Sequence, residues 1–135
     1  MTESSHFQQL LAAARAQTEP HRLLFVFATV ELPDRPTAAQ RARFETGRGG
    51  ALTPLVCVDK APDELTGFEA LAAESERAGP PWQLVFAAAL PGQDGRPPPE
   101  GQVEGALQSM VEAVRVGAFG RFAAYDRMGE PVVFA

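Results

Sequence analysis

Three long apolar runs organise the chain, and each follows a segment in which apolar residues recur at helical spacing. The runs cover residues 22–30, 52–58 and 82–90. They are rich in β-branched and aromatic side chains and lack polar alternation, which predicts strands that are buried on both faces. Near the C-terminus, FGRFAAY and PVVF flank the turn signals of DRMGE, which predicts a terminal hairpin.

Four segments have the apolar periodicity of amphipathic helices. They span residues 5–18, 38–45, 62–78 and about 103–116. Ser5 and Gln8 have the spacing of a capping box at the start of the first helix. Residues 91–101 contain three glycines and four prolines, so we expect an irregular, flexible loop there.

The order of these elements predicts an α/β fold in a single domain that spans residues 1–135. We expect one sheet of four to five strands with helices on both faces, because continuous apolar strands need cover on both sides. The expected sheet is mixed, with a C-terminal antiparallel hairpin. Right-handed parallel crossovers are slightly favoured over antiparallel pairing for the remaining strands.

A weak internal repeat underlies this order. At an offset of 61, residues 7–36 match residues 68–97 at nine of thirty positions. The repeat predicts two pseudo-equivalent helix-strand-helix-strand units, at residues 5–60 and 66–127. Chance matching in an alanine-rich chain is the alternative.

The net charge and the cysteine content limit which classes of partner and which cellular compartment we expect. The chain carries 12 basic and 17 acidic residues, a net charge of −5, which disfavours nucleic acid and anionic membranes as partners. The single cysteine precludes an internal disulfide. The N-terminal sequence MTESSHFQQLL has no basic region before its apolar residues, and no apolar run approaches the roughly 18 residues of a spanning helix. We therefore expect a cytoplasmic protein.

Isolated nucleophiles and histidines give little indication of catalysis or metal binding. Cys57 stands between two valines in a predicted strand, so we interpret it as a buried, unreactive thiol. His6 and His21 lack the spacing of a metal site, and neither a metal nor a cofactor is predicted. The chain contains no G-x-S-x-G or H-E-x-x-H motif, so nothing positive points to an enzyme.

Two charged pairs follow predicted strands and are the leading candidates for a ligand site. Asp59-Lys60 and Asp126-Arg127 are related by the predicted repeat and would occupy the strand-exit edge, where α/β sheets bind ligands. There the aspartates would act as acceptors or bases beside cations. Ordinary turn chemistry is the alternative: Asp59 would bind backbone amides before the next helix, and Asp126 would open a hairpin turn.

Two arginines in loops extend this candidate site. Arg35 and Arg96 each precede a proline and are also related by the predicted repeat. Their guanidinium groups suit the carboxylates or phosphates of an anionic ligand. The alternative is that both side chains are simply solvated.

Four blocks carry a resemblance that covers nearly the whole chain: RLLFVFA, GGALTPLVCVDKAPDEL, F-x-x-L with Glu74-Ser75, and PPWQLVFAA. They resemble a family of short bacterial proteins labelled "ribonucleotide reductase subunit alpha". A true alpha subunit is a large barrel enzyme with several cysteines, whereas this chain has one cysteine in 135 residues. We therefore treat the label as a misnomer that assigns no activity.

A fainter likeness runs from Thr53 to Phe68, where a proline-led strand is followed by an acidic turn and a helix. This order is similar to that of the SseB-like domains, whose biochemistry is undefined. Leu55, Val56 and Cys57 stand where that pattern has an aromatic-threonine step. Neither resemblance assigns a site residue.

Three hypotheses about function follow. The leading one is a non-catalytic cytosolic binding or regulatory domain that contacts another protein or a second copy of itself as a homodimer. The second is a small enzyme or sensor that binds an anionic metabolite. Its ligand-binding residues would be Asp59, Lys60, Asp126, Arg127, Arg35 and Arg96. The third is an acidic inhibitor of a basic partner, which rests on net charge alone.

Overall fold

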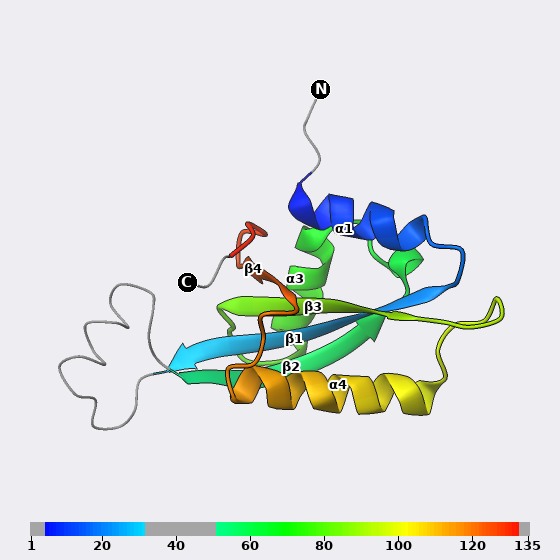
Figure 1. Cartoon of the computed structure of the whole chain (residues 1–135). Coiled ribbons are helices and arrows are strands. Elements are labelled where there is room, and N and C mark those ends of the chain that lie inside the picture. The colour runs from blue at the N-terminus through cyan, green and yellow to red at the C-terminus, as the bar shows by residue number, and fades with distance from the viewer. Residues whose placement is uncertain (1–4, 32–50, 133–135) are drawn as a thin grey trace.

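One antiparallel sheet separates two layers of helices in the computed structural model, which describes residues 5–31 and 51–132 (Figure 1). The strands are β1 (His21–Glu31), β2 (Ala51–Lys60), β3 (Leu84–Pro91) and β4 (Ala123–Asp126). The helices are α1 (His6–Arg15), the 3-10 turn η1 (Pro62–Glu64), α3 (Phe68–Ala78) and α4 (Glu100–Arg115). The strand order is β2-β1-β3-β4.

This architecture confirms the predicted α/β fold with one sheet and helices on both faces. The expectation of a mixed sheet is wrong, because all three strand pairings are antiparallel. β2 and β3 do run parallel to each other, with α3 between them in the chain, but β1 lies between them and opposes both. Continuous apolar runs indicate burial on both faces, and they do not distinguish parallel from antiparallel neighbours.

Side chains of β1 alternate between two hydrophobic clusters. Leu23, Phe25 and Phe27 point into an aromatic cluster with α1, Trp82 and Tyr125. The intervening residues point to the other face, into a cluster covered by α4. α1 and α3 lie on one side of the sheet and α4 on the other (Figure 1). Because successive side chains of a strand point to opposite faces, β1 contributes to the hydrophobic clusters on both sides of the sheet.

Residues matched by the predicted repeat do not occupy equivalent places. Phe25 packs in the cluster beside α1, whereas its counterpart Phe86 packs against α4 on the other face. The order of helix and strand is shared by α1 with β1 and by α3 with β3. The predicted helix at 38–45 lies outside the described residues, and the repeat stays a prediction.

The predicted helix at 62–78 is wrong as a continuous element. Leu65 lies between η1 and α3, is extended at φ −112° and ψ 129°, and is only 2% exposed. Arg15, in the last turn of α1, donates through Nη2 to the Leu65 carbonyl oxygen at 2.6 Å and to the Pro62 carbonyl oxygen at 3.1 Å. Burial of Leu65 and capping of these carbonyls by Arg15 favour the break.

Both ends of the described chain follow local signals that the sequence contains. Ser5 caps α1, and its Oγ accepts from the Gln8 backbone amide at 3.1 Å. The predicted C-terminal hairpin is present but short: Val132 N donates to Ala124 O at 2.9 Å, and Tyr125 bridges Pro131.

The buried contact between Trp82 and Ser75 generates a stability prediction. The indole Nε1 donates to Ser75 Oγ at 2.7 Å, and Ser75 is 3% exposed. Ser75→Ala leaves the buried N–H without its acceptor, so we expect the free energy of unfolding to fall by about 1–3 kcal/mol. Urea unfolding monitored by the fluorescence of the single tryptophan measures this loss.

The matched control is Ser109→Ala, at an exposed position of α4, for which we expect a change within about 0.5 kcal/mol. Equal free energies of unfolding for the two variants would show that the contact between Trp82 and Ser75 does not stabilise the fold.

Candidate functional site

The structure separates the two predicted aspartates. Asp59 lies opposite Leu24, near the start of β1, whereas Asp126 lies opposite Leu84, at the start of β3. β2 and β4 are the two outer strands and run in opposite directions, so their C-terminal ends lie at opposite ends of the sheet. The predicted ligand site, which required both aspartates at one edge, is therefore not formed.

Asp59 and Lys60 are both engaged in ion pairs with neighbouring elements. Arg22 Nε lies 2.6 Å from Asp59 Oδ2, and Arg22 Nη1 lies 3.2 Å from Glu64 Oε1. Lys60 Nζ lies 2.6 Å from Glu74 Oε1 on α3. Glu64 Oε1, rather than Asp59, accepts from a backbone amide before the helix, that of Ala61. Asp59 therefore does not take the predicted turn role; it accepts from a cation of the chain itself, and both charged residues of the pair already have partners.

Asp126 and Arg127 hold the C-terminal hairpin. Asp126 Oδ1 accepts from the backbone amides of Met128 at 2.8 Å and Glu130 at 3.1 Å, which is the role that turn chemistry predicted. Arg127 forms an ion pair with Glu76 and lies over the Trp82 ring, with Cζ 4.8 Å from the centroid. These contacts attach the hairpin to α3.

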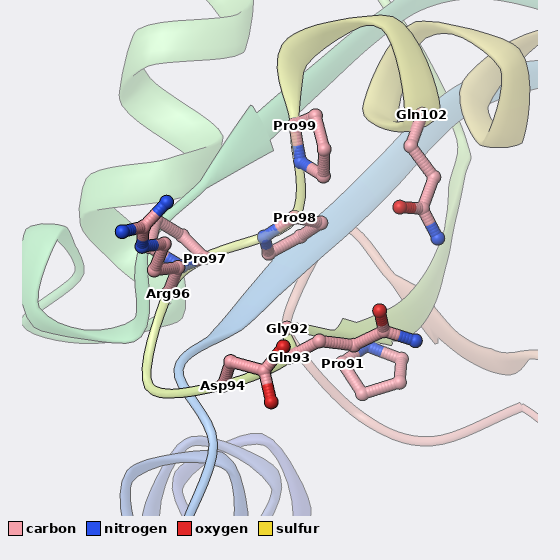
Figure 2. Close-up of a pocket in the computed structure, with 9 residues that line it drawn as sticks. All are labelled: Pro91, Gly92, Gln93, Asp94, Arg96, Pro97, Pro98, Pro99 and Gln102. Carbon is pink, nitrogen blue, oxygen red and sulfur yellow. The ribbon is translucent and has the colours of Figure 1, made fainter.

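Of the two predicted arginines, Arg35 lies outside the described residues and Arg96 lines a hollow of about 470 Å³ in the loop between β3 and α4. The loop turns tightly, since Gln93 and Arg96 exchange both backbone hydrogen bonds at 3.0 Å. Figure 2 shows the Arg96 guanidinium extending away from the side-chain amides of Gln93 and Gln102. The hollow is thus a proline-walled surface depression without converging cations. The predicted flexibility of the loop stays a prediction.

A second hollow, of about 580 Å³, adjoins the first and reaches the Arg22–Asp59 ion pair. Its lining residues are Arg22, Asp59, Pro97, Pro98, Glu100, Val103, Glu104 and Leu107. Three of these are carboxylates, and the single guanidinium among them is already paired with Asp59. This balance of charge is unsuited to an anionic metabolite.

The structure reveals a different feature, the outer edge of β2. By this we mean the backbone of Leu55–Lys60 on the side turned away from β1. In residues 5–31 and 51–132, no strand pairs with this side, whereas the opposite sheet edge, at β4, is partly covered by the bridge between Tyr125 and Pro131. An unpaired strand edge presents N–H and C=O groups that can bind another strand.

Cys57 lies on this outer edge and is exposed, so the prediction of a buried core thiol is wrong. It pairs with Val26, whose side chain enters the cluster beside α4. Its flanking residues Val56 and Val58 pack partly against the cluster on the other face. Cys57 is exposed because β2 is the outermost strand. An apolar run alone does not reveal that position.

Three features limit the stretch of β2 that can accept a strand. Pro54 has no backbone N–H to donate. The register with β1 shifts between Phe27 and Ala28, which leaves Leu55 as the extra residue of a bulge. At the other end, Lys60 is held by α3. The apolar residues Leu55–Val58 lie between these limits.

The charges that would ordinarily protect such an edge are occupied. Natural sheets discourage strand addition with charged edge residues, lysine above all. Here the side chains of Asp59 and Lys60 are 33% and 19% exposed, and each is paired. The outer edge therefore presents apolar side chains and backbone polar groups, and both of its charged side chains already have an ion-pair partner.

No protein-family model, curated protein or solved structure matches this chain. In the described part of the chain, no helix is long and apolar enough to cross a bilayer. The same residues contain no group of three or more His, Cys, Asp or Glu side chains that could hold a metal ion.

The contact between His6 and Tyr125 was not anticipated, because the two residues are 119 positions apart. His6 Nδ1 lies 2.7 Å from Tyr125 Oη, and the tyrosine is fully buried. Burial raises the pKa of Tyr125 to about 12, since the phenolate would lose its hydration. The buried hydroxyl, held by its hydrogen bond with His6, favours a structural role.

Titration of the single tyrosine tests this burial directly. We expect the phenol of the native protein to ionise with a pKa of about 12, and that of the urea-unfolded protein near 10. Because the folded state retains the proton longer, this group's stabilisation is complete below pH 10 and is lost as the pH rises towards 12. Absorbance at the phenolate band gives the pKa; a native value near 10 would contradict the buried placement.

Proposed function

We propose that this domain is a non-catalytic protein-binding domain whose interaction surface is the outer edge of β2. An extended segment of a partner would add to the sheet beside β2 through backbone hydrogen bonds. Such strand addition takes its affinity from main-chain bonds and its specificity from alternate side chains. The proposal includes a cytoplasmic location, in line with a single cysteine that is exposed.

One observation carries the proposal: β2 is the outermost strand, and its apolar stretch Leu55–Val58 lies beside charges that are already paired. An added strand would meet Val56 and Val58 on the face of α3 and Cys57 on the face of α4. It would therefore gain apolar contact in addition to main-chain hydrogen bonds, without leaving a buried charge unpaired.

The alternative of an anion sensor has less support. Its residues divide between the two ends of the sheet, and the hollow beside Arg22 contains more carboxylates than cations. The alternative of an acidic inhibitor still rests only on the net charge of −5. That same charge disfavours nucleic acid as the partner.

A library of random nonapeptides displayed on phage and panned against the intact protein tests the proposal. We expect enriched peptides to be extended sequences with alternating apolar residues, and to shift the backbone amide resonances of Leu55–Lys60. Cys57→Lys should weaken their binding about tenfold, because a lysine in the middle of an edge strand opposes strand addition. Titration of the labelled peptides by fluorescence anisotropy gives the affinities.

Ala13→Lys is the matched control, since it adds the same charge at an exposed position of α1 and should leave the affinities unchanged. Peptides that bind both variants equally, or that shift resonances only in other elements, would contradict a role for the β2 outer edge.

A further inference from the structure

The part of β2 that can accept a strand is symmetric about one residue. Pro54 and the bulge at Leu55 limit it on one side, and Lys60, which is bound to Glu74, limits it on the other. Cys57 lies midway between Pro54 and Lys60. It is also the exposed residue of this stretch, with partly buried neighbours on either side.

Antiparallel pairing of a strand with its own copy obeys a strict geometric rule. A two-fold axis perpendicular to the sheet keeps each side chain on its own face. Residues directly opposite each other also point to the same face. Since neighbours along a strand point to opposite faces, the axis must pass beside one residue, which then faces its own copy.

The axis beside Cys57 gives the best match of side chains. It places Val56 opposite Val58 of the second copy, and by symmetry the same apolar pair forms twice. An axis at Val58 would instead place Val56 opposite Lys60, and one at Val56 would place Pro54 opposite Val58, within the paired stretch. Cys57 itself is small and uncharged, so two copies can approach to the 4.5–5.5 Å that separates the Cβ atoms of directly opposed residues.

Symmetry also favours a second copy over continued assembly. Pairing at β2 would join two four-stranded sheets into one of eight strands. Its two outer edges would then both be β4, which the bridge between Tyr125 and Pro131 partly covers. A contact of this kind closes after two copies, whereas strand addition between different edges would build fibres.

Building on the proposed function, we infer that the strand bound at the β2 outer edge is β2 of a second copy of this chain, antiparallel about a two-fold axis at Cys57. The protein is then a homodimer with a continuous sheet. In this arrangement α3 and α4 of each copy flank the joined strands, because both helices contact β2.

A charge exchange at residue 57 tests the position of the axis. If Cys57 faces its own copy, Cys57→Lys alone and Cys57→Glu alone each bring like charges together, and dimerisation should weaken at least about tenfold. An equal mixture of the two variants should recover a heterodimer with near wild-type affinity. Analytical ultracentrifugation over a range of concentrations measures each dissociation constant.

Three controls accompany the exchange. Cys57→Ser, which is neutral, should dimerise as the wild type does. Ala13→Lys and Ala13→Glu, alone or mixed, should not change the dissociation constant. Circular dichroism of each variant verifies that its secondary structure is retained.

The outcomes separate this inference from the proposed function. A wild-type protein that stays monomeric at millimolar concentration but binds the selected nonapeptides at β2 would overturn the homodimer and leave strand addition intact. A dimer that both charges leave unchanged, or that the mixture does not restore, would overturn the axis at Cys57. A monomer that binds no extended peptide would overturn both.

Discussion

The central position of β1 is the constraint on which the rest of the structure depends. From Leu23 to Ala28, no residue of this strand is more than 3% exposed. Its two edges pair with β2 and β3, and its two faces bury alternate side chains in separate clusters. A strand buried on both faces and both edges requires helices on both sides of the sheet, and it places β2 at the periphery.

The positions of the outer strands determine which partners the charged residues at the margins of the sheet have. α3 crosses one face of the sheet, and its acidic side chains reach both margins: Glu74 binds Lys60 of β2, and Glu76 binds Arg127 beside β4. Exposed ion pairs of this kind add little to stability, about 0–1 kcal/mol. Their main consequence is that Asp59, Lys60 and Arg127 already have partners. In the described part of the chain, the outer edge of β2 still has backbone N–H and C=O groups that no strand pairs with.

The elements of this fold are predictable from the sequence, but their arrangement is not. The apolar runs give β1 and β2 to within a few residues, because a packed strand needs apolar side chains wherever it lies. The same runs do not say which strand is central, and so Phe25, which is buried, and Cys57, which is exposed, occur in similar local sequences. Local pattern contains no information on strand order.

The predicted ligand site depended on the order and directions of the strands, which local sequence does not give. Asp59 and Asp126 were predicted to follow strands and lie within the last two residues of β2 and β4, but whether they meet depends on the directions of those strands. The break at Leu65 was hidden for a similar reason, since the Arg15 side chain that caps it lies 50 residues earlier in the chain. The turn role of Asp126 was predictable because Met128 and Glu130 are only two and four residues away.

Hydrogen exchange of the β2 backbone amides, measured at low and high protein concentration, tests the central claim most directly. In dilute protein we expect alternating protection from Leu55 to Lys60, slow where the amide binds β1 and fast where it faces outwards. At high concentration the fast amides should become protected, while those of β3 stay unchanged. Equal protection along β2 at every concentration would contradict the account, because it would mean that the strand has no outer edge available to a partner.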